Sequence, residues 1–438
     1  MKPVSHSMTR EQFEEIARDG SAGDAIKHLL AAERSKHMLL IRAIYDAAAA
    51  RGRVTAAYNL LARVDRVAPL AAEAVICYPA VGACALYLSR GRPSDHARDR
   101  AGWLASVAAA AAIRGRVTFS IEVPVQRGDA SVVLPSLGRA EFSDAGHASA
   151  AVVRSTAEGA QISCGTARVH VPSDPHADAP GWRALRVVSA FSDGMRLRAI
   201  LDDQNPCRLP SRAANDARFD DVGHELWERV IAGGWQILTR NHPEVAADVT
   251  AAIRVLTPLT APAGSELSAT AREAFGSIAL SMPSSELSMA KTFAHEVQHA
   301  KLAALMDMYP LLELSGEAWY YAPWRQDPRP LAGLLQGAYA YLGVTDFWRR
   351  QRICETDPVQ AMRAHTEFAR WREATKDVTE FLLQSGYLLP HGRFLVNVML
   401  RSLRQWCQEP VHPEARSAAR QMAAKHRAEW LRHHGGAG

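Results

Sequence analysis

The chain has 438 residues, of which 48% are hydrophobic and 22% are charged, so its composition is globular and excludes wholesale disorder and a collagen-like structure. The net charge of +5 comes from 51 basic and 46 acidic residues, and no block of Lys and Arg stands out. We therefore expect no nucleic-acid partner. The six cysteines lie far apart without a CxxC pair, which argues against cysteine-bound zinc or an iron–sulfur cluster and favours a reducing compartment.

The chain also carries no pattern typical of export or of a membrane. Its first residues are polar and then charged, whereas a secretory signal needs an apolar core. The most apolar run, residues 67–88, contains Glu73 and is interrupted by Pro79, so we predict a buried helix pair there and not a membrane span. We expect a cytoplasmic protein without a membrane partner.

Three zones can be separated by the period of their apolar residues, and together they predict an α+β fold that is mostly helical. Residues 1–114 are Ala-rich with helical spacing. Residues 115–210 alternate apolar and polar positions between Gly, Asp and Pro turns, which predicts a middle antiparallel β region. Helical spacing returns over residues 211–438, where two short strand candidates, residues 253–259 and 277–281, precede a long helix.

The long helix carries the strongest chemical signal, the HExxH motif His-Glu-Val-Gln-His at residues 295–299. Ser285 can cap the start of the helix. Residues four apart on a helix lie about 40° apart around its axis, so His295 and His299 can chelate one cation, as in a zincin-like helix. Glu296 lies about 100° away and can reach a water or substrate on that metal, which makes it the catalytic candidate. The alternative is a pair of hydrogen-bonded structural histidines.

The motif indicates a metal but leaves the chemistry of that metal open. With a third protein ligand and an open position, two histidines can hold Zn²⁺ and activate water for peptide hydrolysis. With a carboxylate, they can hold Fe(II) and leave positions for a 2-oxo acid and O₂. Glu317 is the candidate third metal ligand, because it lies 18 positions beyond His299, close to the spacing of one peptidase class. Glu313 competes with it, and either can be a solvated loop acid.

The sequence around the motif resembles a known family, the HExxH-motif proteins of peptide-maturation gene clusters. Members occur alone or fused behind a radical-SAM maturase, and because this chain has no CxxxCxxC it is similar to the stand-alone members. The resemblance implies Fe(II)- and 2-oxoglutarate-dependent β-hydroxylation of ribosomally made peptides, with His295 and His299 as iron ligands. It rests on SMP at residues 281–283, TFAHEVQHAKL at 292–302, YYAPWRQDPRPL at 320–331, GLLQGAYA at 333–340 and VTDFWR at 344–349.

Two arginines in the segment at residues 320–331 suit such a co-substrate. The distal carboxylate of 2-oxoglutarate needs a cation, and a guanidinium can bind it through two parallel hydrogen bonds. Arg325 and Arg329 lie in an aromatic, proline-containing stretch that can hold such a fork. The alternative is that the aromatic residues pack in the core and that both arginines form structural ion pairs.

The remaining helical segment, residues 413–434, is rich in Arg and Ala, and we expect its charge to form a solvated face and not a binding surface. The leading hypothesis is an oxidoreductase of RiPP biosynthesis, a dioxygenase that acts on a ribosomally synthesised precursor peptide, in which Glu296 orients a ligand or the substrate. A zinc peptidase, in which Glu296 deprotonates metal-bound water, and a non-enzymatic peptide-binding partner stay open. The sequence predicts neither the peptide nor the oligomeric state.

Overall fold

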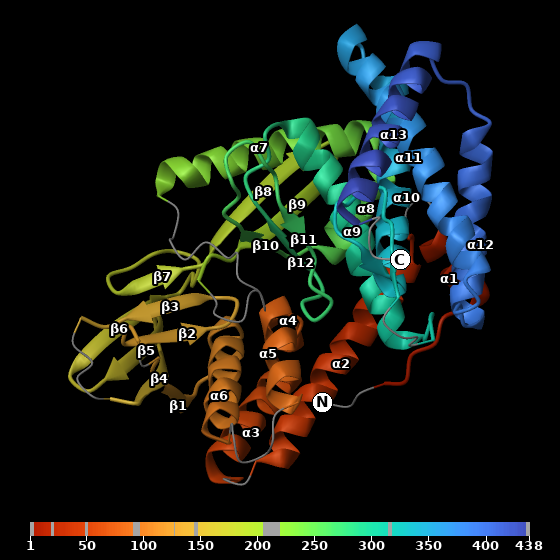
Figure 1. Cartoon of the computed structure of the whole chain (residues 1–438). Coiled ribbons are helices and arrows are strands. Elements are labelled where there is room, and N and C mark those ends of the chain that lie inside the picture. The colour runs from red at the N-terminus through yellow and green to blue at the C-terminus, as the bar shows by residue number, and fades with distance from the viewer. Residues whose placement is uncertain are drawn as a thin grey trace.

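A computed structural model of the chain describes residues 4–18, 22–48, 51–90, 97–126, 128–143, 148–204, 220–313 and 318–434. Helices predominate at both ends of the chain and strands in the middle, which confirms the predicted α+β class (Figure 1).

The first part of the chain is helical, as predicted. The apolar run at residues 67–88 forms two helices joined at Cys77 and Tyr78, and the second of them is largely buried. Among the described residues, no single helix is long and apolar enough to cross a membrane; α4 and α5 reach that limit only as a pair, which is bent by 62°. The helices are α1 (Arg10–Ala17), α2 (Ala25–Ala47), α3 (Arg51–Val67), α4 (Pro69–Ile76), α5 (Pro79–Arg90) and α6 (Ala97–Arg114).

The next seven strands form two antiparallel sheets, one in the order β1-β4-β5-β6 and the other in the order β2-β3-β7. Inward and outward residues alternate along most of them, as the sequence predicts for half-buried strands. The strands are β1 (Ser120–Pro124), β2 (Ser131–Leu134), β3 (Gly138–Glu141), β4 (Ala150–Thr156), β5 (Gly159–Cys164), β6 (Ala167–Pro172) and β7 (Trp182–Ala184).

A third sheet, in the order β11-β12-β10-β9-β8, joins the middle of the chain to its C-terminal part. The two strand candidates at residues 253–259 and 277–281 are confirmed as β10 and β12. The sheet is mixed, because β10 runs parallel to both β9 and β12. The sequence did not predict this pairing, which connects strands about 55 residues apart. The strands are β8 (Arg186–Ser192), β9 (Met195–Leu201), β10 (Val255–Pro258), β11 (Ser268–Ala269) and β12 (Ser277–Leu280).

Helices form most of the rest of the chain, and a short antiparallel pair of strands, β13 (Trp319–Tyr320) and β14 (Arg329–Pro330), precedes the longest run of them. Figure 1 shows α7 lying across the third sheet, and α10 to α13 on the side of α9 that faces away from this sheet. The helices are α7 (Asp221–Asn241), α8 (Pro243–Ala252), α9 (Glu286–Met308), α10 (Leu331–Cys354), α11 (Pro358–Gln384), α12 (Pro390–Cys407) and α13 (Pro413–His434).

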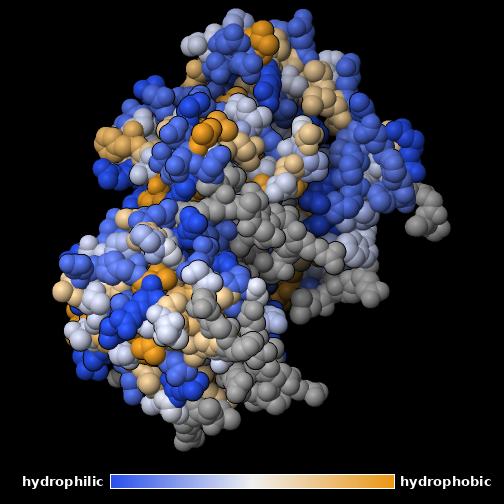
Figure 2. Space-filling model, turned by 90° about the vertical axis from the view of Figure 1, so that its left-hand side faces the viewer, coloured by the Kyte–Doolittle hydropathy of each residue, from blue (hydrophilic) through white to orange (hydrophobic). Residues whose placement is uncertain are grey.

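Two large hydrophobic cores organise these elements. One contains α3 to α6 and the first seven strands. The other contains α7 to α12, the β8–β9 hairpin, and also α1 and the first half of α2. The three zones separated at residues 114 and 210 therefore form two cores, and the N-terminal helix α1 packs in the same core as the C-terminal helices. On the face seen in Figure 2, the coloured hydrophobic residues are scattered among hydrophilic ones.

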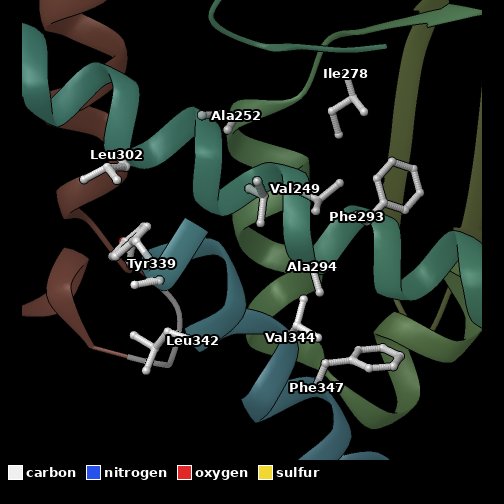
Figure 3. Packing of buried hydrophobic residues seen from close by; sticks show 14 of the residues in the cluster. Val249, Ala252, Ile278, Phe293, Ala294, Leu302, Tyr339, Leu342, Val344 and Phe347 are labelled. Atoms are coloured by element: carbon white, nitrogen blue, oxygen red, sulfur yellow. The ribbon is translucent and has the colours of Figure 1, made fainter. Parts of the chain in front are cut away.

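Helix α9 is enclosed by this second core. Figure 3 shows Phe293, Ala294 and Leu302 of α9 among side chains of α8, β12 and α10. The helix also carries a buried ion pair, in which Lys301 Nζ lies 2.6 Å from Asp248 Oδ2 of α8, with side chains 1% and 3% exposed. The other carboxylate oxygen of Asp248 accepts a hydrogen bond from the backbone of Ala22 (2.9 Å). One carboxylate thus links α8, α9 and the N-terminal segment.

We predict that Lys301→Met lowers the free energy of unfolding by about 3 kcal/mol, because it leaves the Asp248 carboxylate buried without its cation. Urea denaturation followed by circular dichroism measures the change. The control is Lys425→Met, since Lys425 is 78% exposed and lies 4.0 Å from its partner Glu429, and we expect a change within about 0.5 kcal/mol. Equal effects of the two substitutions would contradict the structural role of the buried pair.

Candidate metal centre

The N-terminus of α9 is fixed by a cap and by contacts with a neighbouring loop. β12 ends at Leu280, and Ser285 caps the helix, since its side chain accepts a hydrogen bond from the backbone of Ser288 (3.1 Å). The Glu266 carboxylate accepts a hydrogen bond from the backbone of Ser284 (2.6 Å) and another from the Ser288 hydroxyl. These contacts join the first turn of α9 to the loop that follows β10.

His295 and His299 face each other one turn apart on α9. Their Nε2 atoms are 3.2 Å apart, and the ring planes meet at 76° with centroids 4.8 Å apart. Metal–imidazole bonds are about 2.0–2.1 Å long, so two imidazole nitrogens on one ion lie roughly 3 Å apart. The two histidines therefore fit the spacing of two ligands of a single metal ion.

Both imidazoles are in the protonation state that a metal requires. Burial lowers the pKa of His295 well below 6.5, and the neighbouring His299 and the Lys291 ammonium lower it further. Burial also lowers the pKa of His299, and the Arg329 guanidinium adds to this, although the Glu296 carboxylate opposes it. Neutral imidazole is the ligand form. At neutral pH, no proton has to leave either ring before a metal binds.

Glu296 is buried beside the two histidines, with 1% of its residue surface exposed. One oxygen, Oε2, accepts a hydrogen bond from the Thr270 hydroxyl (2.7 Å), and the other, Oε1, lies 3.8 Å from His295 Nε2. Thr270 follows the edge strand β11 directly. The carboxylate is therefore oriented by β11, with its second oxygen towards the histidines.

A pocket of about 310 Å³ opens at His295 between α9, α10, α11 and the β11 edge. Tyr341 forms part of its wall, with its ring 5.3 Å from that of His295. Burial raises the pKa of Tyr341 to about 12, so its hydroxyl remains a hydrogen-bond donor. The aromatic part of the wall is completed by two indole rings, those of Trp348 and Trp371.

The same pocket is lined by three cationic side chains, those of Lys291, Arg363 and Arg370. Within the described part of the chain, none of the three forms an ion pair. The guanidinium groups of Arg363 and Arg370 lie over the rings of Trp348 and Trp371, at 5.8 and 4.2 Å from the ring centres.

The two acids of the wall have neutral hydrogen-bond donors as partners. Glu266 accepts from Ser284 and Ser288, and Glu367 accepts from the Trp371 indole (2.7 Å). Three cations and two acids thus line the pocket beside His295, and the charge of Lys291 also acts on the Glu266 carboxylate. The small excess of positive charge suits an anionic ligand.

The arginines predicted from sequence lie elsewhere. Both pair with Asp327, Arg325 at 2.7 Å and Arg329 at 3.3 Å, and neither lines the pocket at His295. Arg329 is nevertheless close enough for its charge to lower the pKa of His299. Trp324, between the two short strands, stacks on Tyr341 with ring centres 4.9 Å apart. The aromatic residues of this segment thus contribute to the wall behind the pocket.

The third-ligand candidate Glu317 lies outside the described residues. The competing candidate Glu313 is exposed, and its backbone donates a hydrogen bond to Tyr387 (2.9 Å). Among the described residues, no group of three His, Cys, Asp or Glu side chains is arranged to hold a metal. The described part of the site therefore consists of two imidazoles and one neighbouring carboxylate.

The cations of the pocket, Lys291 on α9 and the pair Arg363 and Arg370 on α11, were not predicted from sequence as site residues. Lys291 lies four positions before His295, so helical spacing alone puts the three side chains of Lys291, His295 and His299 on one face of α9. Arg363 and Arg370 are seven apart on α11, which also places them on one face. That this face lines the same pocket as α9 has no signal in the sequence, because its arginines follow His295 by more than 60 residues.

Neither models of known protein families nor curated proteins show a match to this sequence.

We predict that His295→Ala and His299→Ala each weaken Co²⁺ binding by more than about 100-fold, because loss of even an outer partner of a metal ligand costs 10–100-fold in affinity. Absorption spectroscopy of the Co²⁺ complex measures binding. His433→Ala is the matched control, since His433 lies exposed near the end of α13. Unchanged Co²⁺ binding by both motif variants would show that the two rings are not ligands.

Proposed function

We propose that the protein is an Fe(II)- and 2-oxoglutarate-dependent hydroxylase that modifies a ribosomally made peptide. One observation carries the proposal: of a pair of imidazoles spaced for a metal ion, His295 lines a pocket that holds three cations and two acids. A metal that works together with a dicarboxylate co-substrate needs both parts side by side, whereas a zinc peptidase needs the metal, its water and a base such as Glu296.

The residues of the site would divide these tasks. His295 and His299 would hold the iron as neutral ligands, and a carboxylate would complete the set of two histidines and one acid that leaves positions open on Fe(II). When bound, iron and 2-oxoglutarate supply the chemistry that uses O₂ to replace a C–H bond by C–OH while the co-substrate becomes succinate and CO₂. Lys291 is the cation closest in sequence to His295, one turn away on α9, and would bind the distal carboxylate.

Glu296 and the β11 edge would position the peptide. β11 is the outermost strand of its sheet, Ser268 in β11 lines the pocket, and Leu267 beside it is 40% exposed. An extended peptide that adds to such an edge would run past His295. Glu296, held by Thr270, would then orient a ligand or the substrate backbone instead of deprotonating water.

The activity experiment supplies the protein with Fe(II), 2-oxoglutarate, O₂ and a candidate precursor peptide and measures succinate together with the peptide mass. We expect succinate and a peptide heavier by one oxygen atom, and a loss of at least about 100-fold with His295→Ala. Release of peptide fragments in the presence of Zn²⁺, abolished by Glu296→Gln, would instead establish the peptidase. That alternative is favoured by the position of Glu296 Oε1, 3.8 Å from His295 Nε2.

We also predict that Lys291→Met weakens the binding of 2-oxoglutarate to the Co²⁺-loaded protein by about 10–100-fold, the cost of one charge-assisted hydrogen bond. Calorimetry without O₂ measures the dissociation constant. Arg325→Met is the control, because Arg325 pairs with Asp327 away from the pocket, and should leave the constant unchanged. If Arg329→Met weakens binding and Lys291→Met does not, the carboxylate site lies on the His299 side.

A further inference from the structure

A second concave surface lies between α11 and α13, with a volume of about 530 Å³, and we call it the α11–α13 groove. Figure 1 shows the two helices side by side. Five of its lining residues are arginines: Arg370, Arg372, Arg416, Arg420 and Arg427. The three from α13 are spaced by four and seven positions, so they share one face of that helix. This face is solvated, as the sequence predicts, since all three arginines are exposed, and it also borders the groove.

The acidic residues of the groove neutralise only part of the positive charge of these arginines. Glu373 and Asp377 are its two acidic lining residues, and both pair with Lys376, at 3.3 and 3.4 Å. In the described segments, Arg416 and Arg420 have no carboxylate within ion-pair distance. A groove with five arginines, in which a lysine pairs with both acids, therefore presents positive charge to a ligand.

Arg372 gives a second, independent indication of a ligand. It is 3% exposed, and its Nη1 donates to the backbone oxygens of Trp406 (2.9 Å) and Glu409 (2.8 Å). Its Nε forms an ion pair with Glu373 at 3.9 Å but has no hydrogen-bond acceptor. A buried guanidinium N–H without an acceptor is costly, and an acceptor group bound in the groove would remove that cost.

The groove and the pocket at His295 share a residue. Arg370 lines both, with its guanidinium over Trp371. The arginines from 416 to 427 span about 16 Å along α13, the length of roughly five extended residues. A chain bound along the groove can therefore continue past Arg370 to the pocket.

We propose that the α11–α13 groove binds an acidic, extended segment of the peptide whose other part enters the pocket at His295; this inference rests on the proposed peptide substrate. Carboxylates every second residue would meet the arginines of α13, and backbone carbonyls would supply neutral acceptors. Glu373 and Asp377 disfavour a nucleic acid, whose phosphates carry a denser negative charge along the chain.

The test is fluorescence anisotropy with a labelled ten-residue peptide of alternating Glu and Ala and the full chain. We expect the double variant Arg416→Glu/Arg420→Glu to bind it at least about 10-fold more weakly, since a hydrogen bond to a charged group contributes about 1.5–3 kcal/mol. Arg393→Glu/Arg432→Glu is the charge-matched control, because both residues are exposed outside the groove. It should bind like the unchanged protein.

A second peptide of opposite charge distinguishes a specific loss of binding from misfolding of the variant. The groove variant should gain affinity for a peptide of alternating Lys and Ala, which an unfolded chain would not do, and should keep its Co²⁺ binding. Equal weakening by both double variants, or tighter binding of a ten-nucleotide thymidine strand than of the acidic peptide, would overturn the proposal.

The result of the groove experiment can be told apart from the result of the hydroxylase experiment. Succinate formation with normal peptide turnover, but without groove-dependent binding of the acidic probe, would refute the groove alone. Groove-dependent binding without succinate would refute the hydroxylase and leave an acidic-peptide site that serves another activity.

Discussion

The rotation of α9 about its own axis is the constraint on which the site depends. His295 lines the pocket only because α9 turns its histidine face that way and buries the others. Gly343 of α10 fixes this arrangement, since a Cβ there would lie 2.7 Å from Gln298 Cγ and 3.0 Å from the backbone oxygen of Ala294. Only glycine allows α10 to come this close, and the close approach brings Tyr341, half a turn earlier on α10, to the ring of His295.

The N-terminal segment belongs to the same arrangement. Tyr339 of α10 donates a hydrogen bond to the backbone oxygen of Ile16, and the Tyr309 hydroxyl, just after α9, accepts one from the backbone of Met8 (2.7 Å). Together with the link from Asp248 to Ala22, these contacts attach Met8, Ile16 and Ala22 to the helices that carry the site. Because the contacts are buried or partly buried, loosening this segment would loosen α9, although none of its described residues lines the pocket at His295.

How much could be predicted from sequence follows from which interactions are local. The cap at Ser285, the extent of α9 and the strand before it depend on neighbouring residues, and the sequence predicted all three. The proximity of His295 and His299 is local too, since helical geometry alone brings the two side chains together. The pocket shared by α9 and α11, the pairing of β9 with β10 and the ion pair of Lys301 with Asp248 join distant segments. They follow from tertiary packing, for which a single sequence gives no pattern.

The electrostatics of the site connect the proposed metal to the proposed co-substrate. Lys291 and Arg329 lower the pKa values of the two histidines, and the same positive charges oppose the approach of a metal cation. Lys291, one turn before His295, would repel Fe(II) in a pocket without an anion, and the Glu296 carboxylate would offset part of that repulsion. A bound dicarboxylate cancels part of this repulsion. By linkage, iron must then strengthen the binding of 2-oxoglutarate by the same factor as 2-oxoglutarate strengthens the binding of iron. In the proposed hydroxylase these charges would therefore couple the metal to its co-substrate, whereas in a zinc peptidase the same cations would stabilise the oxyanion that forms on the substrate carbonyl.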